Sequence, residues 1–151
     1  MISAVLTQYS LFNGLEPEQI DKILPLMKHE IYEPGTNIIV EGTFVGKVHF
    51  IIDGRVAVVK GGLVLIEHGD GAVFGEMEIV DVQPAEATVR ALIETRVMTL
   101  SVDALGELYE TDLKTYSFIL MNLARDISRR LRRMDSKAVE NSPNLDLEQR
   151  L

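Results

Sequence analysis

The stretch "VAVVKGGLVLIE", Val56 to Glu67, decides the fold class because it predicts a β-hairpin. Two apolar runs rich in β-branched residues flank Gly61-Gly62, and two consecutive glycines can supply the positive φ angles of a tight turn. Similar short runs, "NIIVEG", "KVHFIIDG" and "EATVRALIETRVMTLS", recur between about 30 and 100, separated by turn residues. Many short strands with this punctuation indicate a β-barrel or jelly roll.

Helical periodicity flanks the strands. The segment "EPEQIDKILPLMK", 16–28, predicts a short helix with Pro17 at its first position. "VDALGELYETD" predicts another, with Asp103 as its N-cap, and a long helix follows over roughly 112–138. The expected fold is therefore mainly β with flanking helices: a double-stranded β-helix (jelly-roll) barrel followed by a long C-terminal dimerisation helix. We divide the chain into 1–102 (N-terminal helix and jelly roll), 103–139 (helical part) and 140–151 (tail).

The apolar residues of the long helix follow spacings of three and four, which is close to a heptad seam. The stripe could pack on its own barrel. However, a helix of this length spans about 40 Å at 1.5 Å per residue, which exceeds the width of a small barrel. We therefore predict a parallel homodimer. Its expected interface residues are Tyr116, Leu120, Leu123, Ile127, Leu131 and Met134.

Composition narrows the function classes. The chain has 151 residues, 46% hydrophobic, a net charge of −8 and no cysteine. Residues 1–120 hold 8 Lys and Arg against 18 Asp and Glu, whereas 121–151 hold 7 against 5. An acidic body repels nucleic acid, and the basic cluster "RDISRRLRR" (125–133) is interpreted as a solvated helix face. No apolar run is long enough to cross a membrane and no signal peptide is evident, so we expect a cytoplasmic protein without a membrane partner.

Several short motifs, in this order and spacing, resemble the cyclic nucleotide-binding domain of catabolite-activator and fumarate–nitrate-regulator proteins. They are the turn at Glu41-Gly42, "IIDGRVAVV" with Gly54, "GDGAVFGE" and "ATVRA". The resemblance spans about 11–138 and implies a stand-alone sensor domain. In those regulators a helix-turn-helix domain follows the dimerisation helix. Here about 12 residues remain after it, so we expect no direct DNA binding by this chain.

The resemblance also implies a ligand site between the barrel and the long helix. A short helix beginning at "FGE" would present backbone N–H groups to a phosphate, with Gly75 allowing close approach and Glu76 accepting a ribose hydroxyl. The apolar wall for the base would consist of Val58, Leu65, Ile66 and Phe74. The same glycines and apolar residues would also be needed simply to shape turns and fill a barrel.

The sequence departs from the family pattern in this site. Ala85 occupies the position of the arginine that pairs with the cyclic phosphate, and Glu86 replaces a small or hydroxyl residue beside it. Glu78 follows Met77 in the short helix at a position that is usually small, and Met134 aligns with residues that contact the base. Arg90 lies on the opposite face of its strand and is expected to form a structural ion pair. We therefore expect no binding of cAMP or cGMP through the usual arginine–phosphate contact.

Two functions remain open. The chain is either a regulatory module, with a different small ligand or a weakly bound nucleotide, or a ligand-free dimerisation scaffold acting on a partner protein or a full-length regulator. An open cavity with unpaired Glu76 or Glu86 would favour a ligand, and one filled by Phe74 or Met134 would favour a scaffold. We expect no enzyme and no metal site, because His29, His49 and His68 are isolated. A cyclic nucleotide, cAMP or cGMP, is the one cofactor that the resemblance leaves open. His68 precedes a glycine-rich turn and is expected to be exposed.

Overall fold

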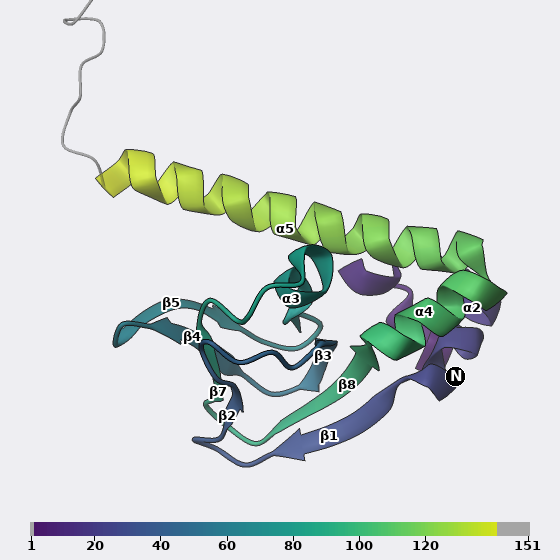
Figure 1. Ribbon diagram of the computed structural model, residues 1–151, viewed down its shortest axis with the longest axis horizontal. Coiled ribbons are helices and arrows are strands. Elements are labelled where there is room, and N and C mark those ends of the chain that lie inside the picture. The colour runs from purple at the N-terminus through teal and green to yellow at the C-terminus, as the bar shows by residue number, and fades with distance from the viewer. Residues whose placement is uncertain (1, 142–151) are drawn as a thin grey trace, which may run out of the picture.

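The computed structural model describes residues 2–141 and contains two four-stranded antiparallel sheets. The first has the order β1-β8-β3-β6 and the second β2-β7-β4-β5, which confirms the predicted jelly roll (Figure 1). The strands are β1 (Lys28–Tyr32), β2 (Asn37–Ile39), β3 (Lys47–Asp53), β4 (Val56–Lys60), β5 (Leu63–His68), β6 (Val73–Phe74), β7 (Thr88–Ala91) and β8 (Thr95–Ser101).

The predicted hairpin is confirmed as β4 and β5. Gly61 and Gly62 have φ angles of 58° and 76°, the left-handed pair that a tight hairpin turn requires. Val58 lies opposite Ile66 in the register. Near the turn, Leu63, Val64 and Leu65 are exposed by 69%, 61% and 50%, so side chains on both faces of this strand end contact solvent.

Helices gather at one end of the barrel and along one side (Figure 1). They are α1 (Ile2–Leu6), η1 (Ser10–Phe12), α2 (Pro17–Ile23), η2 (Leu24–Leu26), α3 (Glu76–Asp81), α4 (Val102–Thr111) and α5 (Leu113–Asn141). Helix α2 begins at Pro17 as expected but is shorter than predicted, because Pro25 cannot donate the backbone hydrogen bond that would continue it.

The N-cap of α4 is Ser101, not the predicted Asp103. The Ser101 hydroxyl accepts a hydrogen bond from the Ala104 N–H at 3.0 Å, and Asp103 lies in the first turn of the helix. Both residue types favour caps, so the sequence alone did not separate them.

The buried side chains form two clusters. One fills the space between the two sheets and includes Ile51, Phe74 and Val97. The other combines the N-terminal helices with β3 and β8 and with α4 and α5, including Phe12, Phe50 and Leu123. The helical part beyond 103 therefore shares a core with the barrel. The first half of α5 packs on the barrel through this second cluster.

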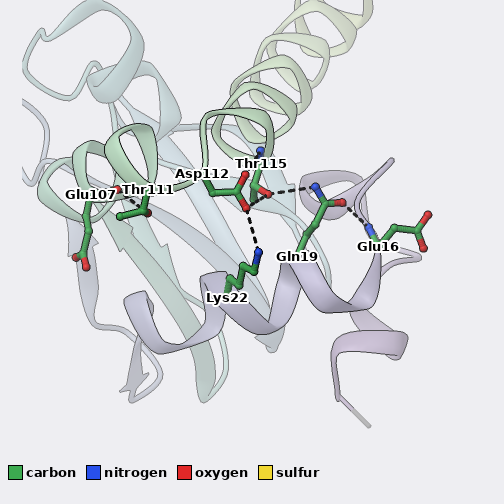
Figure 2. Close-up of polar contacts among 7 residues, drawn as sticks. All are labelled: Glu16, Gln19, Lys22, Glu107, Thr111, Asp112 and Thr115. Atoms are coloured by element: carbon green, nitrogen blue, oxygen red, sulfur yellow. Dashed lines mark hydrogen bonds and ion pairs between the residues drawn. The ribbon is translucent and has the colours of Figure 1, made fainter.

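The start of α5 is fixed at its junction with α2 and α4 (Figure 2). Asp112 Oδ1 accepts from the Thr115 N–H at 3.1 Å and Oδ2 from the Thr115 hydroxyl at 2.7 Å. These bonds lower the pKa of Asp112. Gln19 Nε2 donates to the Thr115 hydroxyl at 3.2 Å, and Lys22 lies 3.9 Å from Asp112. Because this junction ties α5 to α2, the first turns of the long helix have a defined direction.

Candidate ligand site between helix α3 and helix α5

The site begins where β6 turns into α3 at Gly75. This residue has a φ of 81°, and a Cβ added to it would lie 2.9 Å from the Lys47 carbonyl oxygen and 3.1 Å from His49 Nδ1. A side chain would therefore be strained and also obstructed by backbone, which only glycine avoids. The resemblance implied that Gly75 lets the backbone approach a ligand. In the structure, Gly75 instead lets the backbone approach β3, so that α3 packs against this strand.

Phe74, expected in the wall of the ligand site, belongs to the core between the sheets. It is 2% exposed and stacks on the His49 ring with centroids 4.6 Å apart. Burial, together with the nearby Lys47 ammonium, lowers the pKa of His49 to about 4, so this ring is neutral at neutral pH.

Glu76 is the best-defined polar group of the site, and it is paired with α5. Its side chain is 1% exposed and forms an ion pair with Arg130, which also donates to the Val73 carbonyl oxygen. The same guanidinium contacts Asp126 at 2.8 Å. Burial raises the pKa of Glu76, and the Arg130 charge opposes that shift. Arg130 therefore bridges α5 to both β6 and α3.

His68 lies beside this ion pair. The sequence predicted an exposed turn residue, but His68 ends β5 and is only 8% exposed. Burial lowers its pKa to about 4, and the charges of Arg130 and Arg133 act in the same direction. The prediction was wrong because the glycine turn is a local signal, whereas the burial of His68 comes from the position of the end of β5 beside α5, whose Arg130 and Asp126 charges act on the ring.

Glu78 points to the other side of α3. It is 3% exposed, and its Oε1 accepts a hydrogen bond from the Val45 N–H at 3.0 Å. Two residues apart on a helix are separated by about 200°, so Glu76 and Glu78 serve different neighbours. Met77, between them, is 46% exposed.

The segment that replaces the phosphate-binding arginine is held by its backbone. The Ala85 N–H donates to the Thr43 carbonyl at 2.9 Å, and the Ala85 carbonyl accepts from the Gly42 N–H at 2.8 Å. The Ala85 methyl packs on the core between the sheets, whereas Glu86 is exposed. The expected ion pair of Arg90 is corrected: its Nε donates to Asn37 Oδ1, a neutral acceptor, at 2.9 Å.

The remaining expected wall residues are only partly assembled. Val58 and Ile66 are partly buried across from each other in the β4–β5 hairpin, and Leu65 is half exposed. Met134, 65% exposed, lies one helical turn beyond Arg130. The structure therefore brings together Gly75, Glu76 and an arginine of α5, but it does not fill the site with Met134.

The expected dimer stripe needs one revision. Leu123 is 1% exposed and packs in the core of its own chain, so it is not available to a second copy. Tyr116 and Leu120 are partly buried against the same cluster. Leu131 is 57% exposed and Ile127 is intermediate.

Sequence reasoning missed Arg130 and Asp126, because both belong to the basic cluster interpreted as solvated. A signal was present in the spacing. Asp126 follows Ile119 by seven residues and Arg130 follows Leu123 by seven, so both lie on the barrel-facing side of α5. Their separation of four also predicts a pair within the helix.

Within residues 2–141, no helix is long and apolar enough to cross a membrane. No group of three or more histidine, cysteine, aspartate or glutamate side chains is placed to hold a metal ion in that range.

Comparisons with known proteins agree with the geometry. Hyperpolarization-activated cyclic nucleotide-gated channel 2 of Mus musculus is 36% identical over 100 residues, which are 66% of this chain but 12% of the channel. The cyclic AMP receptor protein of Thermus thermophilus is 28% identical over 130 residues, 83% of this chain and 58% of that protein. The chain thus spans less than two thirds of the length of these relatives.

Solved structures show the same architecture. A cyclic nucleotide-binding domain from Methylobacillus flagellatus superposes with a TM-score of 0.85 at 24% identity, covering 95% of this chain and 83% of that one. The catabolite activator protein of Thermus thermophilus superposes with a TM-score of 0.73 at 28% identity, covering 85% and 61%. The family model described as "Cyclic nucleotide-binding domain" matches residues 29–112. The chain therefore belongs to the cyclic nucleotide-binding domain family.

Proposed function

We propose that this chain is a regulatory domain in which Arg130 of α5 pairs with Glu76, the residue expected to bind the ribose. Because Glu76 is already paired, cAMP and cGMP do not bind in the usual way. The observation that carries the proposal is the pairing of Glu76 with Arg130. By resemblance, Glu76 is the group that accepts a ribose hydroxyl. A nucleotide that uses Glu76 has to displace a guanidinium that is bonded to three acceptors, namely Glu76, the Val73 carbonyl and Asp126.

The phosphate contact is weakened independently. Ala85 offers no charge, and its methyl is packed on the barrel core. Losing one charge-assisted bond to a phosphate costs about 1.5–3 kcal/mol, which is roughly a tenfold to 150-fold loss of affinity. Glu86 is exposed, so solvent screens its repulsion of a bound phosphate, and this repulsion adds little to the loss of the arginine.

Dimerisation through α5 is part of the proposal. Within the exposed part of the helix, Leu131 and Met134 continue the side of Ile127, and these apolar residues favour a protein partner over solvent. A second copy fits because it presents the same stripe, as closed twofold symmetry requires. We name Tyr116, Leu120, Ile127, Leu131 and Met134 the α5 stripe.

The alternative function, a ligand-free scaffold, is favoured by a specific observation. Phe74 is packed into the core and Glu76 is paired, so two groups expected to contact a ligand are committed within the chain. In this version the domain acts through its α5 stripe on a partner protein or regulator, without a bound ligand.

Isothermal titration with cAMP and cGMP tests the proposal. We expect no saturable binding at nucleotide concentrations of about 10 μM. Ala85→Arg combined with Arg130→Gln should create binding, since it restores the phosphate cation and releases Glu76. Glu86→Ser alone is the matched control and should change nothing. Saturable binding to the unaltered chain below about 10 μM would overturn the proposal.

A further inference from the structure

Helix α3 carries two buried carboxylates, and only one of them has a cation. Glu76 faces α5 and is paired with Arg130. Glu78 is 3% exposed, and Val45 N–H is the hydrogen-bond donor to its Oε1. Its Oε2 has no hydrogen-bond partner among residues 2–141, and no salt bridge there involves Glu78. Burying an acidic group is costly unless it is paired, so the far side of α3 has an acidic group whose second oxygen lacks a counterpart.

Glu78 lines a groove of about 490 Å³ on this far side. The groove is formed by three separate segments: the turn before β3, α3 and the start of α4. Its lining includes Phe44, Val45, Glu78, Val82, Val102 and Asp103.

The groove walls are apolar, and its only charged lining residues are acids. Phe44, Val82 and Val102 are exposed by 51%, 69% and 47%, and Asp103 is a second carboxylate. The apolar part of a ligand would cover these side chains, and an ammonium group on the same ligand would pair with the Glu78 carboxyl group. The Phe44 ring adds a face that can attract a cation.

We infer that this groove binds a small organic cation with an apolar or aromatic body, paired with Glu78. An organic cation is favoured over a metal ion because no three potential ligands gather within residues 2–141. Oε2 is covered from water, so pairing requires groove side chains to move. The site is separate from Glu76 and does not depend on the proposed function.

The probe for this site is 2-phenylethylammonium, with neutral 2-phenylethanol as its matched analogue. In an NMR titration of the full chain, the ammonium compound should shift the amides of Val45, Glu78 and Val102. The expected dissociation constant is on the order of 1 mM for a ligand of this size. The alcohol should bind at least about tenfold more weakly, because it lacks the charge.

Glu78→Gln is the decisive variant. Its side-chain carbonyl can still accept from the Val45 N–H, so the turn is retained while the charge is lost. Binding of the ammonium probe should fall about tenfold. If this variant does not fold, Val102→Lys provides the test. It places an ammonium group at the exposed groove wall, which should repel the cationic probe and abolish its binding. Glu86→Gln, outside the groove, should leave binding unchanged.

Three results would each overturn the inference. The first is no saturable binding of the ammonium probe up to about 10 mM, a concentration well above the expected constant. The second is equal affinity for the alcohol. The third is unchanged binding in folded Glu78→Gln or in Val102→Lys.

Discussion

The two halves of helix α5 are held to the molecule in different ways. In the first half, 113–123, Ile119 and Leu123 are buried in the core, and Asn122 Nδ2 donates to the carbonyl oxygens of Leu11 and Asn13 at 2.8 and 2.9 Å. In the second half, 124–141, the strongest contact is the Arg130 guanidinium, and every residue after it is exposed. Figure 1 shows this second half extending past α3 along the outside of the molecule.

This contrast indicates which part of α5 can respond to a signal. Apolar burial offers no charge for protons or charged ligands to compete for, so the first half behaves as part of the fold. An ion pair responds to protons, salt and competing charges. The second half is therefore the part whose position a ligand or partner could change.

The largest expected effect comes from breaking the first half. Leu123→Ala removes a buried side chain and leaves a cavity, so the free energy of unfolding should fall by about 2–5 kcal/mol. Urea unfolding followed by circular dichroism measures this loss. Val139→Ala, at a position of the second half that is 76% exposed and lies outside the α5 stripe, is the matched control and should cost less than about 0.5 kcal/mol. Equal losses in the two variants would remove the distinction between the halves.

Acidification should destabilise the molecule next most strongly. The pKa values of His49 and His68 are lowered to about 4 from 6.5. The unfolded chain therefore binds protons that the folded chain does not, and the stability present above pH 6.5 is lost as the pH falls toward 4. Between pH 7 and 5 we expect a loss of about 1–2 kcal/mol for each histidine. The raised pKa of Glu76 acts in the opposite direction and offsets part of it.

Urea unfolding at several pH values separates these contributions. His68→Gln should reduce the loss between pH 7 and 5 by about half, since it removes one of two similar contributions. His29→Gln, at an exposed histidine of β1, should leave the pH dependence unchanged. Two results would contradict a buried neutral histidine beside Arg130. One is a free energy of unfolding that stays constant between pH 7 and 5, and the other is an unchanged pH dependence of that free energy in His68→Gln.

Breaking the ion pair should have a smaller effect on global stability. Arg130→Gln leaves the Glu76 carboxylate buried without a cation, and adding Glu76→Gln should recover part of the loss. The coupling energy from the double-mutant cycle should be about 1–3 kcal/mol, because Arg130 is partly exposed and the charge is partly screened. Arg132→Gln, on the exposed side of α5, is the control. A coupling energy near zero would mean that the pair does not hold the second half.

The α5 stripe should affect assembly rather than folding. Leu131→Glu with Met134→Glu changes two exposed residues, so the free energy of unfolding of a single chain should change by less than about 0.5 kcal/mol. Sedimentation equilibrium should show a dimer for the unaltered chain and a monomer for this variant. Met121→Glu, also exposed but outside the stripe, should remain dimeric. A monomeric unaltered chain at about 100 μM would contradict the proposed dimer.

Local signals in the sequence predicted the parts of the fold that are locally determined. The Gly61-Gly62 turn requires positive φ angles at adjacent residues, and Pro17 fits a first helical position, so both predictions were confirmed. The burial of His68 was not predictable in the same way. It depends on where the end of β5 lies relative to α5, which is a tertiary relationship.

The candidate site was predictable in outline but not in its pairing. The resemblance implied a short helix beginning at the "FGE" motif, and α3 does begin at Glu76, directly after Gly75. The partner of Glu76 is 54 positions away, in a run of arginines whose composition resembles a solvated surface. A helix-face argument separates Arg130 from its neighbours, but only the fold determines which barrel group it meets.

Hydrogen exchange of α5, compared between the unaltered chain and Arg130→Gln, measures whether the Arg130–Glu76 ion pair holds the second half of the helix. If the Arg130 guanidinium holds the second half against α3, backbone amides of 124–141 should exchange faster in the variant. Those of 117–123 should keep their protection, because burial in the core holds them. Unchanged exchange in 124–141, or faster exchange spread evenly over both halves, would contradict the claim that α5 is fixed at one end and latched at Glu76.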